Sequence, residues 1–260
     1  MDRPGPEAAP HVVIVGGYLT EPLLYGRMRR RLLEHGAARV TVTPLHLPDW
    51  LAMAFVGMGP AMLRTARAIR EARRDAPTLP LVIGHSAGGL LARLAMSPEP
   101  IDGRRAGVAD DVGCLVTLGT PHRLAPAILR RHAGVRAVEL LERTAPGCWH
   151  EPATGYLTVG STFVGPRQRV PVHPLRQGIG GVMRGLVGVT PGARGDGIVD
   201  EVRCRLDGAP HVALPDVLHG TLGGPWYGDA AVIDRWWPLA LRAWREALEA
   251  REARGPHERR

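Results

Sequence analysis

The chain has 260 residues and a mass of 28.0 kDa, a size that a single α/β domain commonly reaches. Its 45% hydrophobic and 22% charged residues exclude wholesale disorder, and no apolar run approaches the roughly 18 residues that span a bilayer. The formal net charge is +8, and all 33 basic residues are Arg. A basic surface could bind nucleic acid or an anionic membrane. Because most of these arginines are scattered, we interpret them as solvated side chains on helix surfaces and expect no specific nucleic-acid binding.

Short β-rich runs alternate with amphipathic helices along most of the chain. The expected strands are 11–15, 39–45, 79–83, 112–118, 156–163 and 211–214. The expected helices are 21–36, 61–74, 87–96, 135–142 and 229–253, with less regular stretches at 47–60, 121–134 and 165–195. This alternation predicts an α/β fold with a mostly parallel central sheet, helices on both faces, and a single domain over residues 1–260.

The sharpest local signal is the sequence G-x-S-x-G at residues 84–88, between an apolar strand and a helix of small residues. Such a turn exposes a serine hydroxyl at the sheet edge, and the flanking glycines avoid collisions with strand and helix. With three serines in the chain, about 0.05 chance matches are expected. We therefore interpret Ser86 as a nucleophile, and the N–H of Ala87 as a donor to a developing oxyanion.

A serine nucleophile needs a base and a group that orients the base, and after such an elbow the acid precedes the histidine. Asp196, between two glycines, is the preferred acid, although an Asp-Gly pair is also a turn signal. Asp200 is the second choice, with a cap or turn as its expected role. His219, in a glycine-rich loop after the last expected strand, is the preferred base.

Four further histidines need an interpretation. His85, the variable residue of the elbow, is expected to pack or hydrogen-bond behind Ser86. His122 follows a strand near the site but comes too early in the chain to be the base. His46 could line the pocket or be structural, and His211 is expected at the opposite edge of the sheet.

The second oxyanion donor is expected after the first strand, at residues 16–18, where two glycines let the backbone approach. The N–H of Tyr18 is the predicted donor, and a plain glycine turn is the alternative. No G-K-[ST] follows, so this is not a phosphate loop.

The three cysteines form no C-x-x-C pair, which argues against a disulfide framework and a thiolate zinc site. We expect neither a metal nor an organic cofactor.

Several short motifs carry a family resemblance: VVIVGGY (12–18), VIGHSAGG (82–89), TLGTPH (117–122), GDGIVD (195–200) and, near the end, LPDVLHG and PWYG (225–228). The chain resembles the α/β-hydrolase superfamily, in particular lipase- and esterase-like serine hydrolases. The resemblance implies Ser86 as nucleophile, Asp196 as acid, His219 as base, and Tyr18 and Ala87 as oxyanion-hole donors. The sequence departs from common lipase motifs in two ways: position 16 is Gly rather than His, and the acid motif continues to Asp rather than Pro.

The expected activity is hydrolysis of a small-molecule or lipid carboxylic ester through an acyl-enzyme. A thioesterase, an acyltransferase, or a hydrolase-fold binding protein without activity are the alternatives. The apolar stretches 51–63 and 179–189 are expected either to pack in the core or to form a lid or pocket wall, within 47–60 and 165–195. Residues 1–10 lack the apolar core of a secretory signal, so a cytoplasmic location is expected, with peripheral membrane contact possible and the oligomeric state open.

Overall fold

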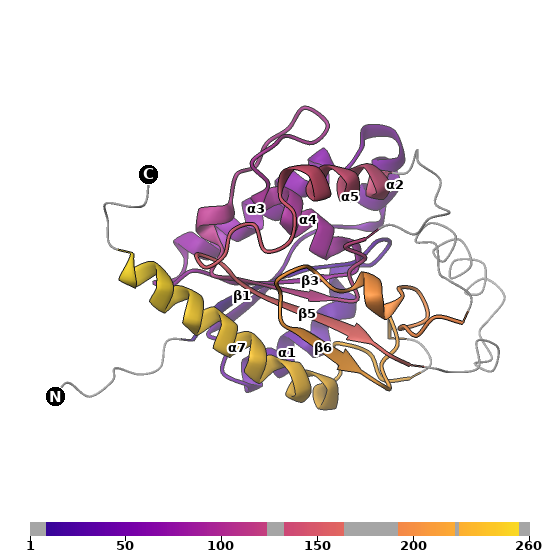
Figure 1. The fold of residues 1–260 in the computed structure, drawn as a ribbon, viewed down its shortest axis with the longest axis vertical. Helices are drawn as coiled ribbons and strands as arrows, with labels where there is room; N and C mark the ends of the chain where they lie inside the picture. The colour runs from indigo at the N-terminus through magenta and orange to yellow at the C-terminus, as the bar shows by residue number, and fades with distance from the viewer. Residues whose placement is uncertain (1–8, 124–132, 164–191, 222–223, 255–260) are drawn as a thin grey trace.

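The fold is built on one parallel sheet. The structure is a computed structural model, and it describes residues 9–123, 133–163, 192–221 and 224–254. Six strands pair in the order β2-β1-β3-β4-β5-β6, and every pair is parallel (Figure 1). The strands are β1 (His11–Val15), β2 (Arg39–Val42), β3 (Leu81–His85), β4 (Cys114–Leu118), β5 (Gly155–Ser161) and β6 (His211–Leu214).

Helices cover both faces of this sheet, which confirms the predicted fold class. The α-helices are α1 (Gly26–Glu34), α2 (Leu47–Val56), α3 (Gly59–Arg74), α4 (Ala87–Met96), α5 (Ala133–Thr144) and α7 (Ala230–Ala253). Short 3₁₀ turns are η1 (Pro22–Tyr25), η2 (Ala109–Asp111) and η3 (Glu201–Arg203). Helices α1 and α7 pack together on one face, while α3 and α4 pack on the other, with α2 against α3 and α5 against α4 (Figure 1).

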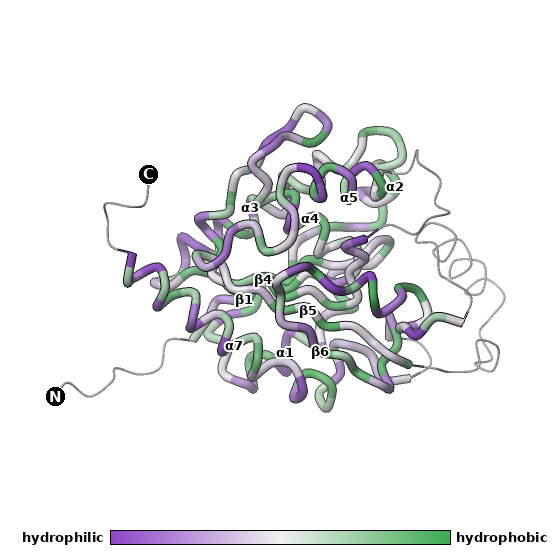
Figure 2. The backbone as a smooth tube through the Cα atoms, viewed as in Figure 1, coloured by the Kyte–Doolittle hydropathy of each residue, from purple (hydrophilic) through white to green (hydrophobic). Residues whose placement is uncertain are grey.

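The strands alternate their side chains between two hydrophobic cores. In β1, Val13 and Val15 belong to the core under α3 and α4, whereas Val12 and Ile14 belong to the core under α1 and α7. Because both faces of β1, β3 and β4 are buried, these central strands read as nearly continuous apolar runs. In Figure 2 the strands at the centre are largely hydrophobic, and the helices around them mix hydrophilic and hydrophobic residues.

Helix α2 was not predicted, because the stretch 47–60 was expected to be irregular. The helix begins after His46, whose backbone N–H donates to the Asp49 carboxylate over 3.0 Å, and it ends at Gly57, which has a φ of 74°. The inner face buries Trp50, but the outer face carries the exposed Phe55. A helix that is apolar on both faces has no amphipathic period, which explains why the pattern was missed.

Several other boundaries differ from the prediction by about two residues, and two differ by more. The expected helix 21–36 is split into η1 and α1, and β2 ends at Val42 rather than at residue 45. The stretches 121–134 and 165–195 lie largely outside the described residues, and with them the predicted lid or pocket wall at 165–195.

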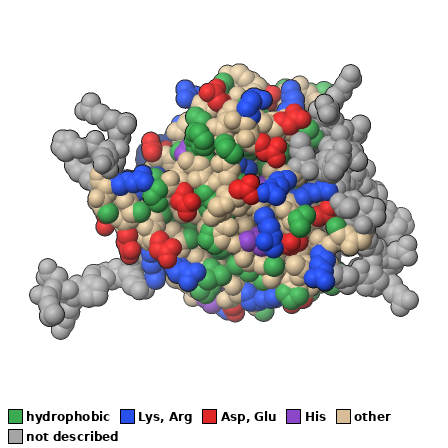
Figure 3. All heavy atoms as spheres, viewed as in Figure 1, with side chains coloured by type: hydrophobic (Ala, Val, Ile, Leu, Met, Phe, Trp, Pro, Cys, Tyr) green, Lys and Arg blue, Asp and Glu red, His purple; other side chains and the backbone are tan. Residues whose placement is uncertain are grey.

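The surface carries both signs of charge. On the face drawn in Figure 3, basic and acidic side chains are interspersed among hydrophobic ones, in keeping with scattered, solvated arginines. Among the described helices, none combines the length and the apolar character that crossing a bilayer requires. All three cysteines, which are Cys114, Cys148 and Cys204, are free thiols.

Candidate active site

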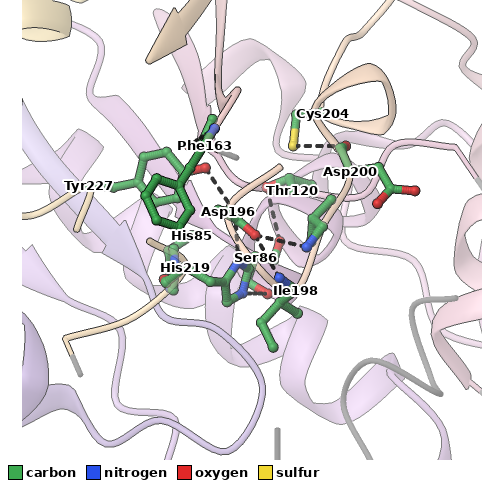
Figure 4. Close-up of polar contacts among 12 residues, drawn as sticks. His85, Ser86, Thr120, Phe163, Asp196, Ile198, Asp200, Cys204, His219 and Tyr227 are labelled. Carbon is green, nitrogen blue, oxygen red and sulfur yellow. Dashed lines mark hydrogen bonds and ion pairs between the residues drawn. The ribbon is translucent and has the colours of Figure 1, made fainter. Parts of the chain in front are cut away.

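Ser86 is the single residue between β3 and α4. Its φ of 54° and ψ of −126° lie in a region that residues other than glycine rarely adopt. Both of its backbone groups are held: the N–H donates to the carbonyl of Leu118 over 2.9 Å, and the carbonyl accepts the hydroxyl of Thr120 over 2.9 Å. The neighbouring strand end therefore stabilises the strained turn and fixes the direction of the serine side chain (Figure 4).

The glycines of the elbow have a steric reason. A Cβ at Gly88 would lie 2.1 Å from the carbonyl oxygen of Val15, and a Cβ at Gly84 would lie 2.4 Å from the Cα of Gly89. Neither contact is possible for a side chain. The first turn of α4 therefore packs directly on the end of β1, which brings the loop after β1 beside Ser86.

The structure brings Ser86, His219 and Asp196 together, although 133 residues separate the serine from the histidine. The Oγ of Ser86 lies 2.9 Å from Nε2 of His219, and Nδ1 of His219 lies 2.8 Å from Oδ2 of Asp196 (Figure 4). Because a carboxylate only accepts hydrogen bonds, Nδ1 carries the proton and Nε2 accepts the serine hydroxyl. The backbone N–H of His219 also donates to the carbonyl of Asp196 over 3.0 Å, which fixes the histidine loop on the acid loop.

Each oxygen of the buried Asp196 carboxylate accepts two hydrogen bonds. Oδ1 accepts the backbone N–H groups of Ile198 at 3.0 Å and Val199 at 2.8 Å, which closes the predicted turn. Oδ2 accepts Nδ1–H of His219 and the hydroxyl of Tyr227, at 2.8 and 2.9 Å. From the sequence, Asp196 was expected either to close a turn or to hold His219. In the structure its carboxylate makes both kinds of hydrogen bond, with Oδ1 in the turn and Oδ2 on His219.

The charge state of Asp196 follows from these contacts. Burial alone would raise the pKa of the carboxyl, but the adjacent His219 and the hydrogen bonds from His219, Val199 and Ile198 together lower it below its ordinary value. Asp196 is therefore ionised at neutral pH and can stabilise a positive charge on the imidazole.

Tyr227 is a site residue that sequence reasoning missed. Its ring and the Asp196 carboxylate pack on Gly119, where a Cβ would lie 2.9 Å from the ring and 2.7 Å from the carboxylate. Burial and the neighbouring Asp196 raise the pKa of Tyr227 well above its ordinary value, so its hydroxyl remains a donor. The PWYG stretch at 225–228 was noted as part of the resemblance, and it was the one available signal.

Asp200, the second-choice acid, instead forms an ion pair of 3.1 Å with Arg203.

The loop after β1 lies against the nucleophile, because a Cβ at Gly17 would lie 3.0 Å from the Cβ of Ser86. The N–H of Gly17 donates to the hydroxyl of Tyr25 over 2.8 Å, and Tyr18 is the next residue along the loop. Ala87 is the first residue of α4, where a backbone N–H has no partner within the helix. The placement is compatible with an oxyanion hole at Tyr18 and Ala87, and the role of both amides remains a prediction.

The other histidines occupy separate positions. His122 is buried and bonds Thr117 over 2.9 Å, His211 pairs with Glu201 over 2.9 Å, and His46 lies at the exposed start of α2. Within the described part of the chain, no group of three or more His, Cys, Asp or Glu side chains is placed to hold a metal ion.

Comparisons with known proteins agree with this architecture. Residues 61–143, which contain β3, the elbow, α4 and β4, match the family model of a PGAP1-like alpha/beta domain. The structure is similar to the mature form of the Bacillus licheniformis lipase BlEst2, with a TM-score of 0.64 and 16% identity over 90% of this chain and 93% of that one. Its propeptide form gives a TM-score of 0.56 and 18% identity over 90% of this chain and 51% of that one. No curated protein sequence matches.

The likeness to the lipase, together with the parallel sheet and its elbow, shows that the chain has the α/β-hydrolase fold. The resemblance in the sequence is thereby confirmed at the level of the fold. The identity of 16% shows the fold alone, so the reaction has to be argued from the residues of this chain.

Proposed function

We propose that the protein is a serine hydrolase that cleaves carboxylic esters through an acyl-enzyme on Ser86. The observation that carries the proposal is the continuous hydrogen-bonded series from the Ser86 hydroxyl through His219 to the buried Asp196 carboxylate, with contacts of 2.9 and 2.8 Å. A serine hydroxyl is a weak nucleophile on its own, and this arrangement is the one that activates it.

The reaction would proceed in two acyl transfers. His219 takes the hydroxyl proton as Ser86 Oγ attacks the ester carbonyl carbon, and the resulting tetrahedral oxyanion collapses with protonation of the leaving alcohol by His219. A water molecule, deprotonated by His219, then attacks the acyl-enzyme, and the carboxylic acid leaves. Asp196 holds His219 in the required tautomer throughout and stabilises the imidazolium that forms in each step.

The oxyanion would be stabilised by amides on two elements. In the proposal, the N–H of Ala87 at the start of α4 and the N–H of Tyr18 in the loop after β1 both point at the developing charge. One such donor lowers the barrier by about 3–4 kcal/mol in comparable sites. Both amides belong to segments that Gly88 allows to pack against each other, so the elbow positions the nucleophile and the oxyanion site together.

An apolar surface on α2, the helix that packs on this loop through Trp50, favours an ester with an apolar acyl or alcohol group. Trp50 of α2 packs edge-on against Tyr18, with ring centroids 5.7 Å apart, and its Nε1–H donates to the carbonyl of Thr20. The outer face of α2 exposes Leu51 and Phe55, at 54% and 89%. Exposed apolar side chains that gather on one face are a common mark of apolar ligands. We propose that α2 contacts the substrate or the lipid surface that contains it.

A thioesterase or an acyltransferase would use the same residues, and the two differ from an esterase only in the leaving group or the acceptor. Product analysis with and without an added alcohol separates hydrolysis from transfer, and matched esters and thioesters separate the leaving groups. The alternative outside the enzymes is a binding protein without activity. The hydrogen-bonded arrangement of Ser86, His219 and Asp196 argues against it.

The test is a series of p-nitrophenyl esters of increasing acyl length and the matched thioesters, scored by kcat/KM with Ser86→Ala as the blank. We expect ester turnover that Ser86→Ala abolishes, and that His219→Ala reduces to background while the protein stays folded. Turnover equal to that of Ser86→Ala on every substrate would contradict the proposal. Activity retained by His219→Ala would show that His219 is not the base.

A further inference from the structure

His85, the residue directly before the nucleophile, has both ring nitrogens in hydrogen bonds within the protein. Nδ1 lies 2.8 Å from the hydroxyl of Tyr25, and Nε2 lies 2.8 Å from the backbone carbonyl oxygen of His219. The side chain is buried behind Ser86, and it has no part in the proposed reaction. The sequence predicted only that it would pack or hydrogen-bond there.

The direction of each hydrogen bond is fixed by chemistry. A carbonyl oxygen only accepts, so Nε2 of His85 carries the proton and donates to His219. Burial and the nearby His219 lower the pKa of His85 to about 3, so the ring is neutral and Nδ1 accepts. The hydroxyl of Tyr25 therefore donates to Nδ1. Its own oxygen accepts the N–H of Gly17 over 2.8 Å.

These contacts join two loops that are far apart in the sequence. The series runs from the Gly17 N–H through the Tyr25 hydroxyl and the His85 ring to the His219 carbonyl. Gly17 directly precedes Tyr18, the proposed oxyanion donor, and His219 is the proposed base. The indole ring of Trp226 packs on both Tyr25 and His85, with centroid distances of 5.9 and 5.8 Å. Such buried and fully satisfied networks hold their members rigidly.

We infer that Tyr25 and His85 are positioning residues that set the oxyanion loop and the base loop relative to each other and to Ser86. The inference rests on the proposed function. Among the contacts described for them, neither side chain hydrogen-bonds the Ser86 hydroxyl or a ring nitrogen of His219, so their effect is on geometry that matters most in the transition state. An error of even 1 Å in such a constellation is costly, and the loss falls on kcat more than on KM.

Tyr25→Phe removes the central hydroxyl and keeps the ring. We expect kcat for p-nitrophenyl acetate to fall by roughly tenfold or more, with KM changed by no more than about twofold. The matched control is Tyr156→Phe, because Tyr156 is also buried and its hydroxyl bonds only the backbone N–H of His150, at 3.4 Å, among the contacts described for it. The control should leave kcat and KM unchanged. Equal effects from the two variants would overturn the inference.

Two substitutions at His85 separate its contacts. His85→Gln places an amide near the position of Nε2 and can still donate to His219, whereas His85→Asn places an acceptor near Nδ1 and can still serve Tyr25. Each should lose kcat, and combining Tyr25→Phe with His85→Gln should cost much less than the product of the single effects, because both break the same series. Independent, multiplicative losses would contradict a single positioning unit.

A readout besides activity keeps this inference distinct from the proposed function. Nitrogen-15 NMR of the His85 ring at pH 5 should show the neutral form protonated at Nε2, and Tyr25→Phe should shift the backbone amide signals of both Gly17 and His219. A wild-type protein without ester turnover would overturn the proposed function alone. A charged ring, protonation at Nδ1, or an unchanged His219 signal in Tyr25→Phe would overturn the positioning role.

Discussion

At the scale of single residues, the three groups of the proposed triad were predictable because each lies in a local motif. Ser86 lies in G-x-S-x-G, Asp196 between glycines, and His219 in a late loop. The contacts of Tyr227 and His85 were not predictable, because their hydrogen bonds join residues 31 and 134 positions apart, and the PWYG stretch was the one signal for Tyr227. The sequence alone does not show which distant residues hydrogen-bond to each other in the folded protein.

The two candidate acids can be separated by matched amide substitutions. In Asp196→Asn, the amide nitrogen facing His219 would donate to Nδ1 and force the proton onto Nε2, where it can no longer accept the Ser86 hydroxyl. We expect kcat to fall by about 10⁴, as in comparable triads, while circular dichroism shows a folded protein.

Asp200→Asn is the control for that substitution. Asp200 pairs with the buried Arg203 over 3.1 Å, so its replacement should lower the thermal stability and leave kcat within about twofold of the wild type. The assignment of Asp196 would be wrong if Asp196→Asn kept more than a tenth of the activity, or if Asp200→Asn proved the more damaging substitution in kcat.

At the scale of elements, the prediction succeeded where the periodicity was clean. Helix α4 and strand β6 have the predicted bounds, and α7 begins directly after its predicted cap Asp229. Helix α2 was missed because its exposed face is as apolar as its buried one, and the split at residue 26 was missed because a 3₁₀ turn has the same apolar content as a helix.

The elbow can be tested with two glycine substitutions of opposite expected sign. Gly88→Ala places a Cβ 2.1 Å from the carbonyl oxygen of Val15, so α4 or the oxyanion loop must move. We expect the free energy of unfolding to fall by roughly 1–3 kcal/mol and most of the ester turnover to be lost. Gly26→Ala, with no atom within 4 Å of the new Cβ and a helical backbone, should be neutral or stabilising by up to about 1 kcal/mol. Urea unfolding and turnover of both variants decide the point, and a fully active Gly88→Ala would refute the packing described here.

The proposed contact of α2 with the substrate has its own test. Replacing both Leu51 and Phe55 by Ser should lower kcat/KM several-fold for a p-nitrophenyl ester of a long acyl chain and leave the acetate ester unchanged, since only the long chain reaches this apolar face. Leu33→Ser is the control, because Leu33 is also exposed but lies on α1, across the sheet. A chain-length profile identical to that of the control would show that α2 does not contact the substrate.

At the scale of the whole molecule, buried neutral histidines link stability to pH. Burial lowers the pKa of His85 to about 3 and that of His122 well below its ordinary value of 6.5. Below pH 6.5, these histidines bind protons in the unfolded chain but stay neutral in the folded protein. Their contribution is therefore full above that pH and is lost as the pH falls toward the lowered pKa of each histidine in the folded protein.

We accordingly expect the free energy of unfolding to decrease from pH 7 to pH 4.5, with a slope of up to about 1.4 kcal/mol per pH unit for each such histidine. Urea unfolding at a series of pH values measures this slope, and His122→Asn should have a shallower one than the wild type. A stability that stays constant over this range would show that these histidines are protonated in the folded protein.

Labelling with a fluorophosphonate tests directly whether Ser86 is an activated nucleophile, because this reagent reacts with a serine only where a base and an oxyanion site activate it. We expect one adduct per chain, mapped by mass spectrometry to Ser86, absent in Ser86→Ala and strongly slowed in His219→Ala. No adduct on the wild-type protein, or an adduct on Ser97 or Ser161 instead, would contradict it.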